Sequence, residues 1–202
     1  MNLAAGAGFW AALLFGLLQN APLPPGDFPT AERIETGRVT VAPGDLLEYR
    51  IRLLPLASFP ALPAPVAAQL SRRGCMIPQS FEAQEPENII HGAFRTSGSD
   101  DWAVLCSVSG TTTLYVFFAD QSDTPLTLRS QPDTAWLGTE PGSSVFSSAW
   151  GIALRRSAEL RAYSEFRRLH ADHDGIEDAR LERSSTIHYC DDGKWIVVDA
   201  GN

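Results

Sequence analysis

The sequence predicts an α+β fold that consists mostly of antiparallel β hairpins and carries two helices. Three observations favour it: several runs alternate apolar and polar residues, short turns rich in Gly and Asp separate them, and two segments have helical periodicity. The chain has 202 residues, 44% hydrophobic and 20% charged, which is an ordinary composition for one domain with a sizeable core. We therefore expect a single globular domain over residues 35–202.

Seven strands are expected along this domain. Each is a short run rich in β-branched and aromatic residues, and in the first two the apolar and polar residues alternate, as in half-buried strands. Tight turns at residues 43–45, 109–111 and 191–194 join three pairs of them into hairpins. The expected strands are residues 38–41, 47–53, 88–94, 102–108, 112–118, 186–190 and 195–199.

The two expected helices have recognisable ends. Residues 66–73 follow Pro65, which suits a first helical turn, and precede Gly74, which suits a C-terminal cap. Ser157 is expected to cap a second helix that runs to about residue 169, with an apolar stripe on its inner face. Residues 120–148 are rich in Ser, Thr, Pro and Gly, and we expect a surface excursion there.

The N-terminal segment predicts export. Residues 1–21 contain no charged side chain, and the apolar run at residues 3–18 is short for a membrane span but fits a signal peptide. Residues 22–34 form a Pro-rich linker. We expect a periplasmic or secreted protein; the alternative is a protein anchored to the membrane by residues 3–18, which is also the only membrane contact expected.

The charge balance argues against one class of partner. The formal net charge is −8 at pH 7, and all charged residues follow the N-terminal segment. An acidic surface repels phosphate backbones, so we expect no nucleic-acid partner.

Three cysteines, Cys75, Cys106 and Cys190, make an odd count. One disulfide and one free thiol is the simplest arrangement outside the cytoplasm. We expect the disulfide between Cys75, which follows a turn-like Arg-Gly pair, and Cys106, which ends an apolar run. The alternative is three buried, inert thiols.

The segment 170–178 holds the candidate metal ligands. The spacing of its acidic residues around Gly175 resembles the calcium loops of FG-GAP repeats, in which oxygen ligands at alternate positions surround a hard cation. A turn with solvated acids explains the same pattern without a metal. Imidazole and carboxylate groups also suit zinc, so a second possible ligand set uses the histidines. The calcium candidates are Asp172, Asp174 and Asp178, and the zinc candidates are His170 and His173 with a neighbouring Asp.

The same segment also takes part in a weak internal similarity. Residues 98–103 and 174–179 each place a turn rich in Gly and acidic residues before a strand and a hairpin. This shared order suggests a degenerate duplication.

Several catalytic motifs are missing from the sequence. It contains no G-x-S-x-G elbow, no phosphate-binding G-x-x-x-x-G-K loop and no H-E-x-x-H helix. Whether the protein is an enzyme stays open at this stage. We expect an exported, non-enzymatic binding or interaction module; the alternative is a small exported metal-assisted hydrolase centred on residues 170–178.

Four runs of sequence are shared with a known group of proteins. They are RGCMIPQ at residues 73–79, DWAVLCS at residues 101–107, WGI at residues 150–152 and HDGIED at residues 173–178. With them the chain resembles an uncharacterised family of bacterial exported proteins, from about residue 46 to the C-terminus. The resemblance implies export and a common organisation, draws attention to Cys75 and Cys106 as members of the motifs, and supplies no catalytic residue.

Overall fold

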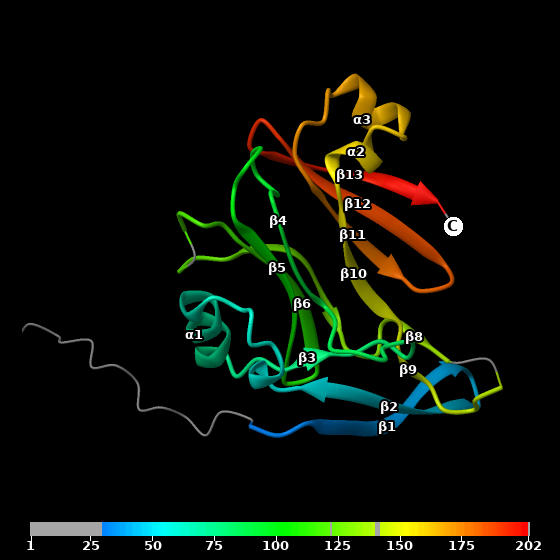
Figure 1. Cartoon of the computed structure of the whole chain (residues 1–202). Coiled ribbons are helices and arrows are strands. Elements are labelled where there is room, and N and C mark those ends of the chain that lie inside the picture. Colours follow the sequence, from blue (N-terminus) through cyan, green and yellow to red (C-terminus); the bar gives the residue numbers. More distant parts are fainter. Residues whose placement is uncertain (1–29, 122, 140–141, 202) are drawn as a thin grey trace, which may run out of the picture.

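A computed structural model describes residues 30–121, 123–139 and 142–201. Two four-stranded antiparallel meanders form its body, and in each the strands follow one another in chain order (Figure 1). The first contains β4 (Ile89–Gly92), β5 (Asp101–Val108), β6 (Thr111–Phe117) and β7 (Leu126–Pro132). The second contains β10 (Trp150–Arg155), β11 (Gly175–Arg180), β12 (Ser184–Asp191) and β13 (Lys194–Gly201).

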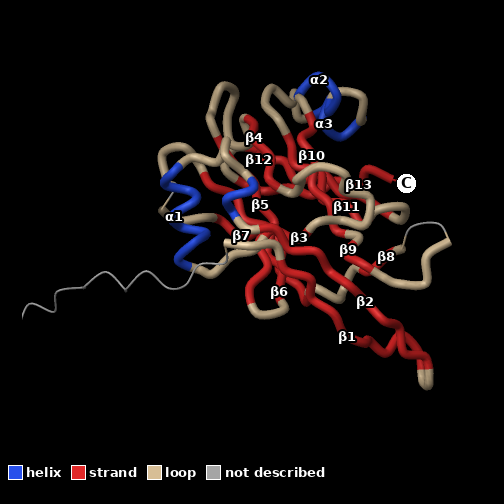
Figure 2. Tube along the Cα trace, turned by 60° about the horizontal axis from the view of Figure 1, so that its bottom comes forward, coloured by secondary structure: helices blue, strands red, loops and turns tan. Residues whose placement is uncertain are grey.

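A long hairpin crosses the bottom of the molecule in Figure 1. It consists of β1 (Arg33–Ala42) and β2 (Asp45–Leu54), and β2 also pairs with the two-residue β3 (Ile77–Pro78). The tip of the hairpin projects from the other described strands and helices (Figure 2). A further pair, β8 (Leu137–Gly138) and β9 (Ser147–Ser148), lies beside β2.

The hairpin has one close contact between its own strands and two backbone hydrogen bonds to the body of the protein. A Cβ atom on Gly37 would lie 2.6 Å from the hydroxyl oxygen of Tyr49, so the ring of Tyr49 lies directly over Gly37 and would have to shift if a larger residue replaced it. Backbone hydrogen bonds from Arg50 to Phe146 (2.7 Å) and from Phe146 to Glu48 (3.1 Å) then attach β2 to the segment before β9. The hairpin is therefore fixed to the body at its middle as well as at its base.

The first predicted helix is present and the second is divided. Helix α1 (Ala64–Arg72) begins after Pro63, and Gly74 follows it with a φ of 73°, as a C-terminal cap requires. A 3-10 turn, η1 (Leu56–Ser58), precedes it. In place of one helix from Ser157 to residue 169, the chain forms α2 (Ser157–Leu160) and α3 (Ser164–Arg168).

The break between α2 and α3 has a visible cause. Tyr163 adopts an extended conformation (φ −85°, ψ 137°), which stops the helical hydrogen-bond ladder. The guanidinium of Arg167 donates from Nη1 to the carbonyls of Arg161 (3.0 Å) and Ala162 (2.6 Å), which the break leaves without helical partners. Leu160 in α2 and Phe166 in α3 are both buried, so the predicted apolar stripe still faces the core although it is divided between two short helices.

Six of the observed strands were not predicted, the two-residue β3 among them. The excursion expected at residues 120–148 contains β7 together with β8 and β9, and β7 is the half-exposed outer strand of its sheet. Strands β10 and β11 were also missed, the latter because its start was interpreted as a metal-binding turn. Strand β1 begins at Arg33, so the last two residues of the predicted linker belong to a strand.

The N-terminal predictions lie outside the described residues. Residues 1–21, expected to be a signal peptide or anchor, and residues 22–29 of the linker are not described. Within the described part of the chain, no helix has the length and apolar character needed to cross a membrane.

The two meanders share one apolar core. Phe94, Leu105 and Leu114 from the first sheet region pack with Trp150 and Ile176 from the second, and all five are at most 3% exposed. Each fully buried large side chain contributes about 1.5–3 kcal/mol to stability. The core therefore holds the sheets together as one body.

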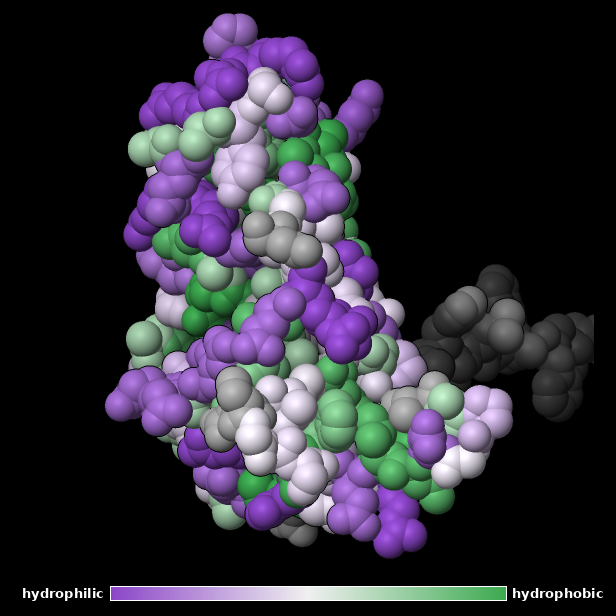
Figure 3. Space-filling view, turned by 90° about the vertical axis from the view of Figure 1, so that its right-hand side faces the viewer, coloured by the Kyte–Doolittle hydropathy of each residue, from purple (hydrophilic) through white to green (hydrophobic). Residues whose placement is uncertain are grey.

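The surface carries scattered apolar side chains. Figure 3 shows the face at the right of Figure 1, where hydrophilic residues cover most of the upper part and hydrophobic residues appear in small groups. Among the described residues, the well-exposed large hydrophobic side chains are Ile34, Leu46, Val145 and Val197.

Asn88 joins three segments at the centre of the fold. It is 1% exposed and has a φ of 70°, a conformation that Asn tolerates better than most residues. Its amide nitrogen donates to the carbonyls of Pro78 (2.7 Å) and Trp150 (3.2 Å), and its Oδ1 accepts from the backbone of Ile152 (3.0 Å). One side chain thus links β3 and β10 to the start of β4.

We expect Asn88→Ala to lower the free energy of unfolding by about 2 kcal/mol, because it leaves buried backbone groups without partners. Urea denaturation monitored by tryptophan fluorescence measures this change. Thr113→Ala is the matched control, since it removes an exposed hydrogen bond to Ser130 and should change stability by less than about 0.5 kcal/mol. Equal midpoints for the two variants would contradict the role assigned to Asn88.

Candidate functional site

The segment 170–178 borders a hollow of about 540 Å³ near the end of the second sheet. Three segments form its walls: residues 95–97 after β4, residues 169–173 after α3, and residues 189–193 at the turn between β12 and β13. We call this hollow the loop pocket. It brings together stretches that lie almost 100 residues apart in the chain.

His173 forms part of the wall of the loop pocket. The side chain is 7% exposed, and its Nδ1 lies 2.7 Å from Oδ1 of Asp172 and 3.1 Å from the hydroxyl of Tyr189. The imidazole is stacked on the ring of Tyr189, with centroids 4.2 Å apart. A proton on Nδ1 satisfies the Asp172 carboxylate, which assigns the acceptor role to Nε2 in the neutral ring. This Nε2 is buried without a hydrogen-bond partner among the described residues.

The neighbours of His173 titrate away from their ordinary values. The hydrogen bond with His173 is the main reason that the pKa of Asp172 is lowered. Burial raises the pKa of the Tyr189 phenol, and the charge of Asp172 adds to that effect. At neutral pH the pocket wall therefore contains an ionised Asp172 and a neutral Tyr189.

The other charged side chains of the pocket are one arginine that already has an acidic partner and two aspartates that have no basic partner among the described residues. Arg95 donates from Nη2 to Oδ1 of Asp120 at 2.7 Å and stacks over Phe118, so its charge is already neutralised. Asp191 and Asp192 come from the β12–β13 turn, and neither forms an ion pair with another described residue. The loop pocket consequently has an excess of carboxylates.

Cys190 lines the same pocket as a free thiol. It is 2% exposed, and burial raises its pKa, so the protonated form dominates at neutral pH. A buried, protonated thiol is a poor nucleophile. We therefore assign Cys190 a packing role.

The carboxylates predicted to bind calcium have separate partners. Asp172 points to His173, whereas Asp174 accepts from the backbone of Ser157 and Ala93 and from the Arg156 guanidinium, each at 3.2 Å. Asp178 lies within β11, because the chain continues from Gly175 as a strand and does not curl into a loop.

No metal-binding group forms in the described part of the chain, since no three His, Cys, Asp or Glu side chains there are arranged to hold an ion. His170, the other zinc candidate, is exposed, has a φ of 54° and lines the loop pocket with His173. The predictions of calcium or zinc binding thus gain no support from this geometry.

Asp178 instead forms a buried polar cluster between the two sheets. Its Oδ2 lies 2.5 Å from Nε of Arg129 on β7 and 3.0 Å from Nε2 of His188, and its Oδ1 accepts from the Trp150 indole at 2.7 Å. Burial alone raises the pKa of Asp178, but the hydrogen bond from His188 and the charge of Arg129 outweigh it, so the pKa is lowered. The cluster fastens the sheets to each other through an ionised carboxylate.

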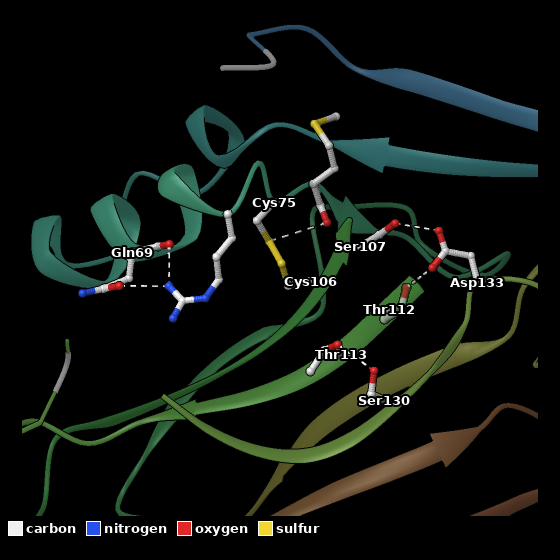
Figure 4. The surroundings of a disulfide bond; sticks show 10 residues. Gln69, Cys75, Cys106, Ser107, Thr112, Thr113, Ser130 and Asp133 are labelled. Carbon is white, nitrogen blue, oxygen red and sulfur yellow. Dashed lines mark hydrogen bonds between the residues drawn. A yellow bond between two sulfur atoms is a disulfide. The ribbon is translucent and has the colours of Figure 1, made fainter. Parts of the chain in front are cut away.

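The predicted disulfide is confirmed. Cys75, just after α1, is bonded to Cys106 on β5, across a sequence separation of 31 residues (Figure 4). Cys190, the third cysteine, is free. Beside the disulfide, the hydroxyls of Ser107 and Thr112 both donate to Asp133 at 2.6 Å (Figure 4).

Several members of the loop pocket were not identified from the sequence. Asp191 and Asp192 were interpreted as turn residues, and Tyr189 and Arg95 were given no role. The excess of acidic residues in the turn was a visible signal. Their proximity to His173 depends on tertiary contacts that no local pattern encodes.

The chain matches none of the family models, curated proteins or solved structures with which it was compared. The resemblance to exported bacterial proteins therefore stays a prediction, and the function must be inferred from the geometry.

Proposed function

We propose that this protein is an exported, non-enzymatic binding module and that its loop pocket binds a small organic cation that carries N–H donors. The observation that carries the proposal is the excess of carboxylates in the pocket wall. Asp172, Asp191 and Asp192 line it, whereas the guanidinium of Arg95 is already paired with Asp120. A cationic ligand supplies the missing positive charge.

The hydrogen-bonding groups favour the same ligand. The carboxylates of Asp172, Asp191 and Asp192 are acceptors only. An ammonium or guanidinium group has several N–H donors and satisfies such a wall. The net charge of −8 also raises the local concentration of cations around the protein.

Export is part of the proposal. A disulfide within the folded domain is typical of proteins in oxidising compartments. The apolar run at residues 3–18 precedes it in the sequence and fits a signal peptide.

Thermal melting with added amines tests the ligand class. We expect spermidine at about 1 mM to raise the melting temperature, because a ligand that binds only the folded state stabilises it. Tetramethylammonium, which has a positive charge and no N–H donor, should raise it less at equal ionic strength. The double variant Asp191→Asn with Asp192→Asn should bind spermidine about tenfold more weakly.

Asp45→Asn is the control for this experiment, since Asp45 is exposed at the start of β2, far along the chain from the pocket. It should keep the response of the wild type. An equal loss of response in both variants would mean that the amine binds through general charge, and no response in the wild type would also refute the proposal.

One observation favours a hydrolase as the second candidate. The contact between Asp172 and Nδ1 of His173 is an arrangement that orients an imidazole as a general base. However, no hydroxyl or thiol is hydrogen-bonded to Nε2 among the described residues, so a nucleophile is not in place. Ester hydrolysis by the wild type that disappears in His173→Gln would favour this candidate over the binding module.

A further inference from the structure

The outer edge of β1 is open. The strand is the last of the sheet β1-β2-β3 and pairs only with β2 in the described structure. In an antiparallel ladder every second residue points its N–H and C=O away from the partner strand. None of the other backbone hydrogen bonds of the described residues involves residues 33–36. These groups are therefore available to a further strand.

A trough of about 750 Å³ runs beside this edge. Four consecutive residues of β1, 33–36, line one side of it. Successive side chains of a strand point to opposite faces, so a hollow lined by four consecutive residues follows the strand's edge rather than one face. Its other wall is formed by Arg73 and Gly74 after α1 and by residues 108–110 at the turn between β5 and β6.

The walls of the trough combine free space with positive charge. Gly74 and Gly110 have no other atoms within 4 Å of where a Cβ would lie, so the wall opposite β1 is open. Arg33 is half exposed and lies 3.8 Å from Glu35, a long contact for an ion pair. Arg73 donates to the carbonyl and amide oxygens of Gln69, which are neutral. Two guanidinium groups thus face one carboxylate in a protein that is acidic overall.

We propose that the trough along the open edge of β1 is a second binding site, which takes an extended peptide with alternating apolar and acidic residues. The peptide adds a strand to the sheet through backbone hydrogen bonds. Its acidic side chains lie beside Arg33 and Arg73. An apolar side chain packs beside Ile34, which is 42% exposed on the other face of the strand.

A second copy of the chain fits this edge less well. If the same four residues paired across a two-fold axis, Ile34 of one copy would lie opposite Glu35 of the other. That pairing sets an apolar side chain against a carboxylate and brings no additional acidic groups to Arg73. The charge and the apolar position of the edge both favour a separate acidic peptide.

Fluorescence anisotropy with the full chain tests the proposal. The probe is a labelled, amidated octapeptide of alternating Val and Glu, compared with the corresponding Val and Lys peptide. We expect the acidic peptide to bind and the basic one to bind at least about tenfold more weakly. Arg33→Glu should weaken binding of the acidic peptide about tenfold and strengthen binding of the basic one.

Arg38→Glu is the matched control, because Arg38 lies on the same strand outside the trough and pairs with Glu48. It should leave both affinities unchanged, and circular dichroism verifies that each variant is folded. A version of the acidic peptide with N-methylated amides should not bind, since it cannot form the ladder.

Three results would overturn the proposal. They are no binding of the acidic peptide, equal effects of Arg33→Glu and Arg38→Glu, and equal affinity of the N-methylated peptide. Concentration-dependent dimerisation that is abolished by Ile34→Lys would assign the edge to a second copy instead. Spermidine binding at the loop pocket is independent of all these outcomes, so the two proposals fail separately.

Discussion

Replacing Asp178 by Ala is expected to lower the free energy of unfolding by about 3–5 kcal/mol, because a fully buried carboxylate is removed while its donors, including the partly buried Arg129, remain. The Arg129 guanidinium, the His188 imidazole and the Trp150 indole all lose their acceptor. For a chain of this size the melting temperature should fall by about 10 °C. Differential scanning calorimetry measures both quantities.

The same cluster predicts a dependence on pH. The folded-state pKa of Asp178 is lowered, so its stabilising effect is complete above the ordinary carboxyl pKa of about 4 and is lost as the pH falls through the lowered value. Wild-type stability should therefore decrease below about pH 4. Asp178→Asn, which does not ionise, should show a smaller decrease over this range.

Glu48→Gln is the matched control for the charge. It breaks the contact between Arg38 and Glu48, a pair of the same chemistry in which both side chains are 66% exposed. Exposed pairs contribute about 0–1 kcal/mol, so its melting temperature should stay close to that of the wild type. A similar, small change in Asp178→Ala and Glu48→Gln would contradict the structural role of the buried cluster.

The parts of the fold that could be predicted are those whose partners are close together in the sequence. Hairpins with tight turns, such as β5–β6 around Gly110 and β12–β13 around Gly193, were found because their turn residues and flanking strands are adjacent in sequence. Strand β7 was missed since it lies at the edge of its sheet and alternates exposed and half-buried residues with few apolar side chains.

Strand β11 shows a different limit. Gly175 and Asp178 were assigned to a calcium loop, but Ile176 and Asp178 are both buried on the same face of a strand. The buried carboxylate is stabilised there by His188 and Trp150 and by Arg129, which lies 49 positions earlier in the chain. No local pattern reveals a partner that comes from the other sheet.

The weak internal similarity fits the observed topology. Residues 98–103 lead into β5 and residues 174–179 contain most of β11, and each of these is the second strand of a four-stranded meander. The two regions therefore lie at equivalent strands of the two meanders, although residues 174–179 form the strand itself and not a turn before it, and the duplication stays a prediction. Of the candidate pocket, the sequence indicated His170, Asp172 and His173, which share one loop.

Loss of the disulfide between Cys75 and Cys106 is expected to lower the free energy of unfolding by about 3–4 kcal/mol. The bond closes a loop with a sequence separation of 31 residues, and the chain-entropy relation assigns about this amount to a loop of that length. Both half-cystines are also buried in the core beneath α1 with Val66, Leu70 and Val104. The double variant Cys75→Ala with Cys106→Ala should therefore melt about 10 °C below the wild type.

Adding a reductant distinguishes the contribution of the covalent bond to stability from the contribution of side-chain packing. Dithiothreitol should lower the melting temperature of the wild type and leave that of the double variant unchanged, because the variant has no disulfide to lose. Cys190→Ala should respond to dithiothreitol like the wild type, because Cys190 is a free thiol and its replacement leaves the disulfide in place. If reductant changes neither the wild type nor Cys190→Ala, the link between α1 and β5 contributes nothing to stability, and the core around Val104 alone holds the helix in place.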